Sequence, residues 1–295
     1  MKPIRTILFP TDFSQAATEM APYATEMAER FHSNVIVLHA FDAVRDYVLA
    51  SSYEATYGSE PIVIPYTGIL QELRNERQRR LEQFARDQFL TVEHAVKIVD
   101  GNPASVIELV AHNENADLIV MPTRGIGKFR RLLLGSITAK VLHDITCPVL
   151  TSAHEPAPAL ARTSGYRSIV CAVDLNRESD VILKAAAFLA QTYGARLCLI
   201  HMESARSQQH DEDALAESIR HAFQRTLYAD GGKPRVDVKV RILEAGIPEG
   251  IRNAAAEEKA DMVIVGRGHE QGNISRLWSH LYTIIRESPC PVLSV

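Results

Sequence analysis

Residue types suited to holding a phosphate or another anion gather near the middle of the chain. An apolar run, Leu118–Met121, leads into a short segment rich in glycine and basic residues, and Gly135 and Ser136 then open a helical pattern. Glycine lets backbone N–H groups approach an anion closely, Ser136 can cap the helix, and the positive end of the helix dipole lies at the same place. These features predict a phosphate-binding loop, although it lacks the Gly-Lys-Ser/Thr ending of the P-loop class. The glycine and basic residues of the segment are Arg124, Gly125, Gly127, Lys128, Arg130 and Arg131.

Length and composition favour a globular protein of two domains. The chain has 295 residues, of which 46% are hydrophobic and 23% charged, and its net charge is -4 at pH 7. The slight negative charge argues against a general nucleic-acid binder, which would need a basic face. No apolar run approaches the roughly 20 residues of a membrane span. Because the first residues lead into a strand rather than a signal peptide, we expect a cytoplasmic location.

The four cysteines predict no metal site and no disulfide. Each lies inside or beside a strand-like apolar run, and no two of them form a Cys-x-x-Cys pair. We therefore expect buried, reduced thiols. The cysteines are Cys147, Cys171, Cys198 and Cys290.

The chain contains the same pattern twice. Residues 5–12, which end in Pro10, Thr11 and Asp12, recur 162 positions later as residues 167–174. Such ordered matches predict two copies of one domain. We expect domain 1 at residues 1–153, an Ala/Pro-rich linker at 154–165 and domain 2 at 166–295. The other matching segments are 38–39 with 200–201, 116–120 with 260–264, and 147–150 with 290–293.

Each copy alternates apolar strands with amphipathic helices. Ser14 is a suitable N-cap for a helix ending near Phe31, whose apolar residues follow the three-and-four spacing of one buried face. Continuous apolar strands between helices imply a parallel sheet covered on both faces. The expected fold class is therefore α/β, with two similar doubly wound, Rossmann-like domains in tandem. The expected strands of the first copy are 4–9, 35–40, 92–99, 118–121 and 149–151, and its further helices are 68–90, one after Pro103 and one after Ser136.

Separate signals meet at one edge of this expected sheet. Asp12 follows the first strand, Ala40 ends the second, and Arg124 and Gly125 follow the fourth. In doubly wound sheets, ligands bind beyond the carboxyl ends of the strands, where the strand order reverses. The sequence therefore predicts a ligand site there.

The chain resembles the universal stress proteins in their tandem form, within the wider adenine nucleotide alpha hydrolase-like group. The resemblance covers almost the whole chain and rests on the Pro-Thr-Asp strand end, Leu38-His39, the Ala-Asp-Leu-Ile-Val strand, and Cys-Pro-Val-Leu in the last strand. ATP-binding members carry Gly-x-x-Gly, nine residues, then Gly-Ser/Thr. Gly125, Gly135 and Ser136 keep that spacing, whereas Pro122 replaces the first glycine.

The resemblance implies an ATP site in the first copy, and leaves Mg²⁺ open as a companion ion. Thr11 and Asp12 would lie against the adenosine part, and Ala40 would offer backbone groups to the adenine. The phosphates would lie at the glycine loop and the following helix start. Because proline has no N–H, Pro122 should weaken binding. The full set implied is Pro10, Thr11, Asp12, Ala40, Met121, Pro122, Arg124, Gly125, Gly135, Ser136 and Ile137.

The second copy departs from the pattern. It keeps Asp174 and Gly266, but Trp278 aligns with Gly135 and His269 aligns with Gly125. An indole would fill space that a phosphate needs. We therefore expect one nucleotide site per chain, in the N-terminal half.

Two equivalent histidines, His39 and His201, end the second strand of each copy. No carboxylate or cysteine clusters with them in sequence, so a structural role is favoured over a catalytic or metal-binding one. Nothing resembles a nucleophile–base pair, so we expect at most slow ATP hydrolysis.

A tyrosine-bearing insertion, residues 41–66, has no counterpart in the second copy. It is expected to be either a lid over the site or a docking surface. The function favoured is a stress-response switch whose docking to an unknown protein partner depends on bound nucleotide. The alternatives are a nucleotide-free interaction protein that uses the insertion, and an adenine nucleotide hydrolase. The Cys-Pro-Val strands are expected to pair the two halves as an internal pseudo-dimer, and further association into a homodimer stays open.

Overall fold

The computed structural model describes residues 3–42, 66–123, 134–152, 165–174, 179–203, 211–228, 236–267 and 274–295. Most of the insertion and the linker, and all of the segment 124–133, therefore lie outside the described residues. The elements of the N-terminal half are β1 (Thr6–Pro10), α1 (Gln15–Phe31), β2 (Asn34–Phe41), α3 (Tyr66–Gln88), β3 (His94–Asp100), α4 (Pro103–Asn113), β4 (Leu118–Met121), α5 (Ser136–Asp144) and β5 (Val149–Thr151). Those of the C-terminal half are β6 (Ser168–Ala172), α6 (Ser179–Tyr193), β7 (Arg196–Met202), α7 (Glu212–Tyr228), β8 (Val238–Leu243), α8 (Ile247–Glu257), β9 (Met262–Val265), α9 (Ile274–Glu287) and β10 (Val292–Ser294).

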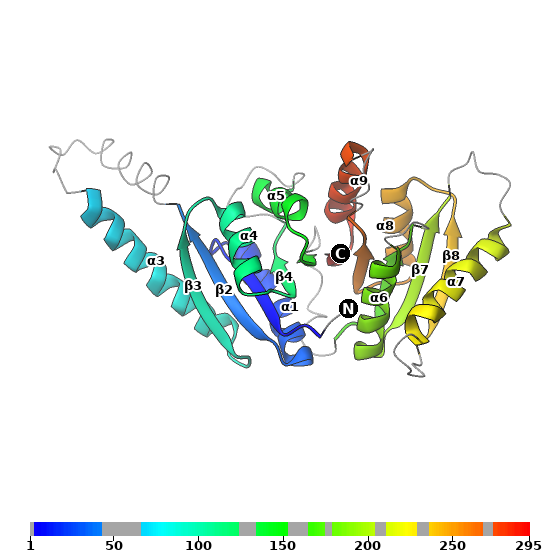
Figure 1. The fold of residues 1–295 in the computed structure, drawn as a ribbon, viewed down its shortest axis with the longest axis horizontal. Helices are drawn as coiled ribbons and strands as arrows, with labels where there is room; N and C mark the ends of the chain where they lie inside the picture. Colours follow the sequence, from blue (N-terminus) through cyan, green and yellow to red (C-terminus); the bar gives the residue numbers. More distant parts are fainter. Residues whose placement is uncertain are drawn as a thin grey trace.

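The described strands form one ten-stranded sheet in the order β3-β2-β1-β4-β5-β10-β9-β6-β7-β8. Figure 1 shows β2, β3 and β4 in the N-terminal half and β7 and β8 in the C-terminal half beside it. Each half contributes five parallel strands in the same internal order, with its first strand between its second and fourth. The predicted α/β class, with two doubly wound domains in tandem, is confirmed.

The two halves join through β5 and β10, which pair antiparallel. Thr151 lies opposite Val292, Leu150 opposite Leu293, and Val149 opposite Ser294. Leu150 and Leu293 are equivalent in the repeat and lie opposite each other. The two strands are therefore related by an approximate two-fold axis that passes between these residues. The pairing satisfies backbone groups that each half would otherwise expose at a sheet edge. The prediction that the Cys-Pro-Val strands pair is confirmed.

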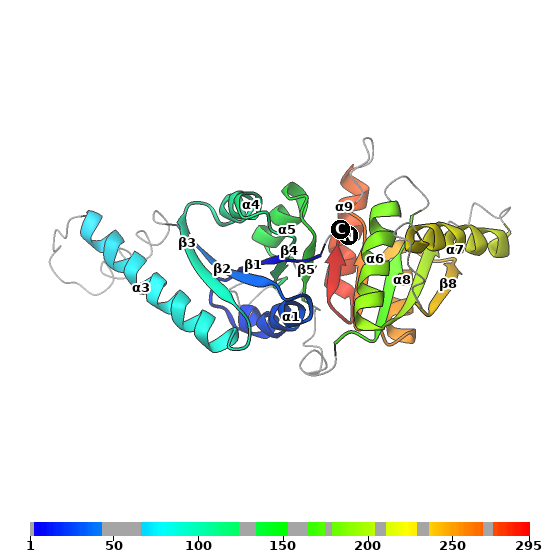
Figure 2. The same ribbon diagram turned by 60° about the horizontal axis from the view of Figure 1, so that its bottom comes forward.

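Alternating strand residues divide the core into two layers, one on each face of the sheet. Ile7 and Phe9 face the layer formed with α1, α3, α6 and α7, whereas Leu8 faces the layer formed with α4, α5, α8 and α9. Figure 2 shows α1 and α4 on opposite sides of the strands of the first half. Both layers contain residues from both halves, so the hydrophobic core is continuous across the β5–β10 pairing.

The aspartate of the repeated Ala-Asp sequence has the same structural role in both halves. The Asp117 carboxylate accepts hydrogen bonds from the backbone N–H groups of Arg5 (2.8 Å) and Thr6 (3.1 Å), and so anchors the start of β1. Asp261 does the same for Arg167 (2.7 Å) and Ser168 (2.9 Å) in the second half. These two carboxylates therefore stabilise the fold.

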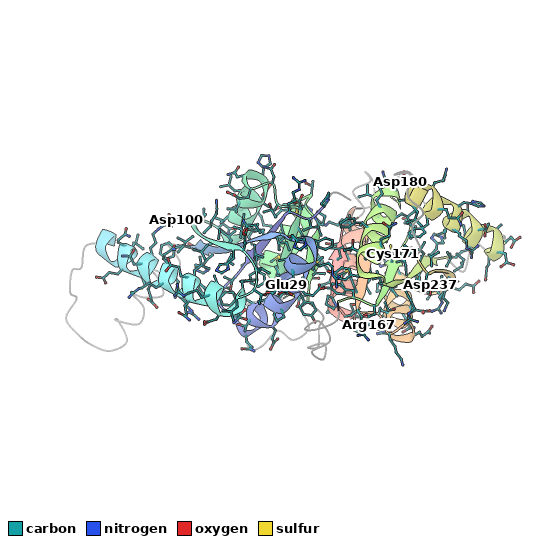
Figure 3. The ribbon with its side chains drawn as sticks, turned by 90° about the horizontal axis from the view of Figure 1, so that it is seen from below. Glu29, Asp100, Arg167, Cys171, Asp180 and Asp237 are labelled. Carbon is teal, nitrogen blue, oxygen red and sulfur yellow. The ribbon has the colours of Figure 1, made fainter. Side chains whose placement is uncertain are left out.

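All four thiols are free, and three of the four are buried as predicted. Cys171, Cys198 and Cys290 are buried, and Cys147 is partly exposed. Cys171 lies within the second half, whereas Asp180 lies at its edge (Figure 3). Burial raises the pKa of Cys147 to about 12 and that of Cys198 to about 11, so neither is poised to react as a thiolate. No helix among the described residues is long and apolar enough to cross a membrane.

A half-buried polar contact joins α1 to α6 across the two halves. The Tyr193 hydroxyl donates to the Glu26 carboxylate at 2.9 Å, and Arg30 lies over the Tyr193 ring. Burial raises the pKa of Glu26, and the Tyr193 hydrogen bond and the Arg30 charge only partly offset this effect. Folding therefore favours the neutral carboxyl relative to the unfolded chain, and the associated stability is lost as the pH rises through the folded-state pKa.

Replacing Glu26 with glutamine should remove this pH dependence. We expect Glu26→Gln to gain stability relative to the wild type as the pH rises from about 4 to about 8, because glutamine stays neutral. Urea unfolding at several pH values measures the difference. Glu72→Gln, at an exposed position on α3, is the matched control. A difference that is constant with pH, or that moves against glutamine, would contradict the account.

Candidate functional site

The ends of β1, β2 and β4 bring most of the predicted site residues to one edge of the sheet. Pro10 lies opposite Leu38 in the β1–β2 register, and the Thr11 N–H donates to the Leu38 carbonyl oxygen at 2.8 Å. Ala40 follows on β2, and Met121 ends β4 on the other side of β1. This edge is the point where the strand order reverses, which is the ligand-binding position of doubly wound sheets.

A tight turn fixes Asp12 at this edge. The Thr11 hydroxyl oxygen accepts from the Phe13 N–H, the Asp12 Oδ1 accepts from the Ser14 N–H, and both distances are 3.0 Å. Ser14 then caps α1 as predicted, because its hydroxyl oxygen accepts from the Ala17 N–H at 3.2 Å. The carboxylate therefore sits between the end of β1 and the start of α1.

Phe13 has an unusual backbone conformation in this turn, which the sequence does not predict. Its φ of 60° is in the left-handed region, which costs about 1–2 kcal/mol for a residue with a Cβ. The ring is held by the His39 ring, with centroids 4.5 Å apart, and by the Arg80 guanidinium, 4.6 Å from the ring centroid. Strain at a ligand-binding edge, kept in place by packing, is typical of functional sites.

The two strand-end histidines have the structural role that the sequence predicts. His39 Nδ1 donates to the Thr11 carbonyl oxygen at 2.8 Å, and His201 Nδ1 donates to the Val173 carbonyl oxygen at the same distance. Each ring fastens the end of the first strand to the second. The same contact in both halves favours a role in the fold.

The start of α5 is tied to the end of β4. The Gly135 N–H donates to the Thr123 carbonyl oxygen at 2.9 Å, and the Thr138 hydroxyl donates to the Pro122 carbonyl oxygen at 3.0 Å. The Thr123 N–H in turn donates to the Ser152 hydroxyl oxygen on the neighbouring chain segment. The two ends of the predicted phosphate loop therefore meet, while Arg124, Gly125 and the other loop residues lie outside the described ones.

The prediction that Ser136 caps α5 is wrong. Gly135 is the N-cap residue, and Ser136 is the exposed first residue of the helix. The cause is the bond from Gly135 to Thr123, which holds Gly135 in an extended conformation with φ of −61° and ψ of 140°. Glycine has no side chain, so no side-chain hydrogen bond caps this helix. Its positive end keeps an anion-binding character at the edge occupied by Asp12.

A comparison with protein families decides the relationship. The model of the universal stress protein family matches residues 3–152 and, a second time, residues 165–295. The chain belongs to the universal stress protein family. A universal stress protein of Thermus aquaticus is 32% identical over 146 residues, which make up 50% of this chain and 96% of that relative. A second relative, from Methanocaldococcus jannaschii, is 29% identical over 146 residues, covering 50% of this chain and 80% of the relative.

A solved structure shares the tandem arrangement of this universal stress protein. The crystal structure of a universal stress protein from Archaeoglobus fulgidus superposes with a TM-score of 0.68 at 22% identity, covering 98% of this chain and 95% of that one. This likeness shows the fold.

Among the described residues, the second half differs from the first at two positions equivalent to this edge. Gly266 is equivalent to Pro122, and a Cβ atom added there would lie 2.5 Å from Cδ1 of Ile182, so α6 already fills the adjoining space. Helix α9 begins at Ile274, whereas Ser279 aligns with Ser136, so the aligned position lies inside the helix and not at its start. Trp278 lies in the same helix, and His269 lies outside the described residues. Among the residues described, no group of three His, Cys, Asp or Glu side chains could hold a metal ion.

Phe13 offers a direct measure of strain at this edge. We expect Phe13→Gly to be more stable than Phe13→Ala by about 1 kcal/mol, because both lose the ring and only glycine adopts the left-handed conformation freely. Urea unfolding of both variants measures the difference. In the ordinary helix α3, the same pair at Phe84 should show the opposite order. Equal stability of the two Phe13 variants would contradict a strained turn.

Proposed function

We propose that the N-terminal half of this universal stress protein binds ATP or a related adenine nucleotide, and that binding changes what the protein docks with. The observation that carries the proposal is the convergence of the Asp12 turn, the end of β4 and the start of α5 at one switch point. The spacing from Gly125 to Gly135 and Ser136, shared with ATP-binding members of the family, supports it.

The roles follow from the chemistry of each group. A carboxylate such as Asp12 accepts hydrogen bonds from ribose hydroxyls, and Thr11 lies beside it. Backbone groups at Ala40 suit the polar edge of adenine. N–H groups at a helix start suit phosphates, which assigns the phosphate end to Gly135 and its neighbours. The remaining proposed residues are Pro10, Met121, Pro122, Arg124, Gly125, Ser136 and Ile137.

Mg²⁺ would depend on the nucleotide for most of its ligands. Hard cations of this kind take oxygen ligands, and the part of the chain that is described contains no cluster of three acidic or other metal-binding side chains. Phosphate oxygens and water would then complete its coordination.

Pro122 should lower the affinity of this site. It is buried at the end of β4, has no N–H to donate, and offers only its carbonyl oxygen, which already accepts from Thr138. The same observation favours a second candidate, a nucleotide-free interaction protein that works through residues 41–66. Titration with ATP separates the two.

Tryptophan substitutions at two glycines test the placement of the phosphates. Gly135 and Gly246 are both N-cap residues with nearly identical backbone angles and no side-chain cap, one in each half. We expect Gly135→Trp to abolish ATP binding in calorimetric titration, because the indole would occupy the phosphate position. Gly246→Trp, which enters open space, should leave binding unchanged. Equal affinity in the Gly135 variant and the wild type would refute the site.

The variant Pro122→Gly tests how much the proline lowers the affinity for ATP. Restoring glycine supplies an N–H group and should tighten ATP binding about tenfold, the effect of one hydrogen bond to a charged group. The dissociation constants of the variant and the wild type, measured under the same conditions, decide the point. An unchanged or weaker affinity would show that the proline is not what limits the site.

A further inference from the structure

One arginine of the C-terminal half crosses into the N-terminal half. Arg267 follows β9 and is only 2% exposed. Its guanidinium donates to the carbonyl oxygens of Ile145 and Cys147, which lie between α5 and β5 in the other half. It also donates to the carbonyl oxygen of Ser294 at 3.1 Å and to the Ser294 hydroxyl oxygen at 3.3 Å. The side chain therefore links β10 to the segment that precedes β5.

The acceptors around Arg267 are oxygens without formal charge. Among the described residues no side-chain carboxylate pairs with it, and one of its acceptors, Ile145, is the C-cap of α5, where the helix dipole is negative. Burial lowers the pKa of Arg267 to about 10, so the group stays charged at neutral pH. A buried cation held in this way is costly unless every hydrogen bond is kept.

The arrangement is not symmetric. Thr123 is the equivalent of Arg267 in the first half, and its hydroxyl contacts Ser152 of its own half at 3.2 Å instead of crossing the interface. The turn equivalent to Ile145–Cys147 is also different, because the Ser288 hydroxyl donates to the Cys290 carbonyl oxygen at 2.7 Å within that turn. The C-terminal half therefore supplies the donor of this contact, and the N-terminal half supplies the acceptors.

We propose that Arg267 makes the β5–β10 interface specific for unlike halves, so that the chain closes on itself and does not pair like halves with a second copy. Backbone pairing between edge strands discriminates poorly, because every strand offers the same N–H and C=O groups. Two N-terminal halves would leave the carbonyl groups of Ile145 and Cys147 without the guanidinium. Two C-terminal halves would bury two arginines against turns in which the Ser288 hydroxyl already donates to the Cys290 carbonyl oxygen. Both like pairings lose hydrogen bonds that the unlike pairing keeps.

Cleaving the linker of the folded chain tests this proposal. A protease site placed within residues 154–165 lets the two halves separate after cleavage, and native mass spectrometry then counts which halves are paired. We expect the cleaved wild type to contain only unlike pairs. In Arg267→Thr, which copies Thr123, like pairs should appear, and halves should exchange with an isotope-labelled sample about tenfold faster or more. Arg252→Thr, at an exposed arginine on α8, is the matched control and should behave as the wild type.

A reciprocal variant keeps the test independent of how well Arg267→Thr folds. Thr123→Arg gives the first half the missing guanidinium, so pairs of two N-terminal halves should form after cleavage. Like pairs in the cleaved wild type would overturn the proposal. Unlike pairs alone, with unchanged exchange rates, in both the Arg267 and Thr123 variants would also overturn it.

Discussion

The antiparallel pairing of β5 with β10 is the interaction on which the rest of the structure depends. It joins two five-stranded parallel sheets into one, and it places the equivalent residues Leu150 and Leu293 opposite each other. Both hydrophobic layers run across it. Since each half covers the open edge of the other, the copies are held together while the carboxyl ends of their strands are free to diverge.

The divergence is visible at equivalent positions. The first half keeps a carboxylate in a strained turn and a helix start without a side-chain cap. In the second half, Ile182 packs against Gly266 and α9 starts earlier along the chain. The residue after Gly266 is Arg267, which serves the interface. The proposed nucleotide site lies in one copy, and the residue that follows Gly266 in the other copy serves the interface.

The fold could be predicted from the sequence because its signals are local. Apolar runs mark the strands, Ser14 marks the start of α1, and the internal repeat reveals the two copies. The cap of α5 could not be predicted, because the bond between Gly135 and Thr123 decides it and the sequence does not show that these residues meet. Phe13 was missed for a similar reason, since its conformation depends on His39 and Arg80 from other elements.

Arg267 was the least predictable of the important residues. Its acceptors in the other half are backbone carbonyl groups more than a hundred positions earlier, and every residue type has such a group. A lone arginine after an apolar strand therefore carries no signal in the sequence. Only the tertiary structure shows that it is buried.

The central claim is that each chain has one nucleotide site, in its N-terminal half. The number of ATP molecules bound per chain tests this claim most directly. Native mass spectrometry of the wild type, Asp12→Asn and Asp174→Asn would compare the two equivalent carboxylates in the intact protein. We expect one ATP per chain in the wild type and in Asp174→Asn, and a marked loss in Asp12→Asn. Two ATP molecules per chain, or loss of ATP in Asp174→Asn with full binding in Asp12→Asn, would contradict it.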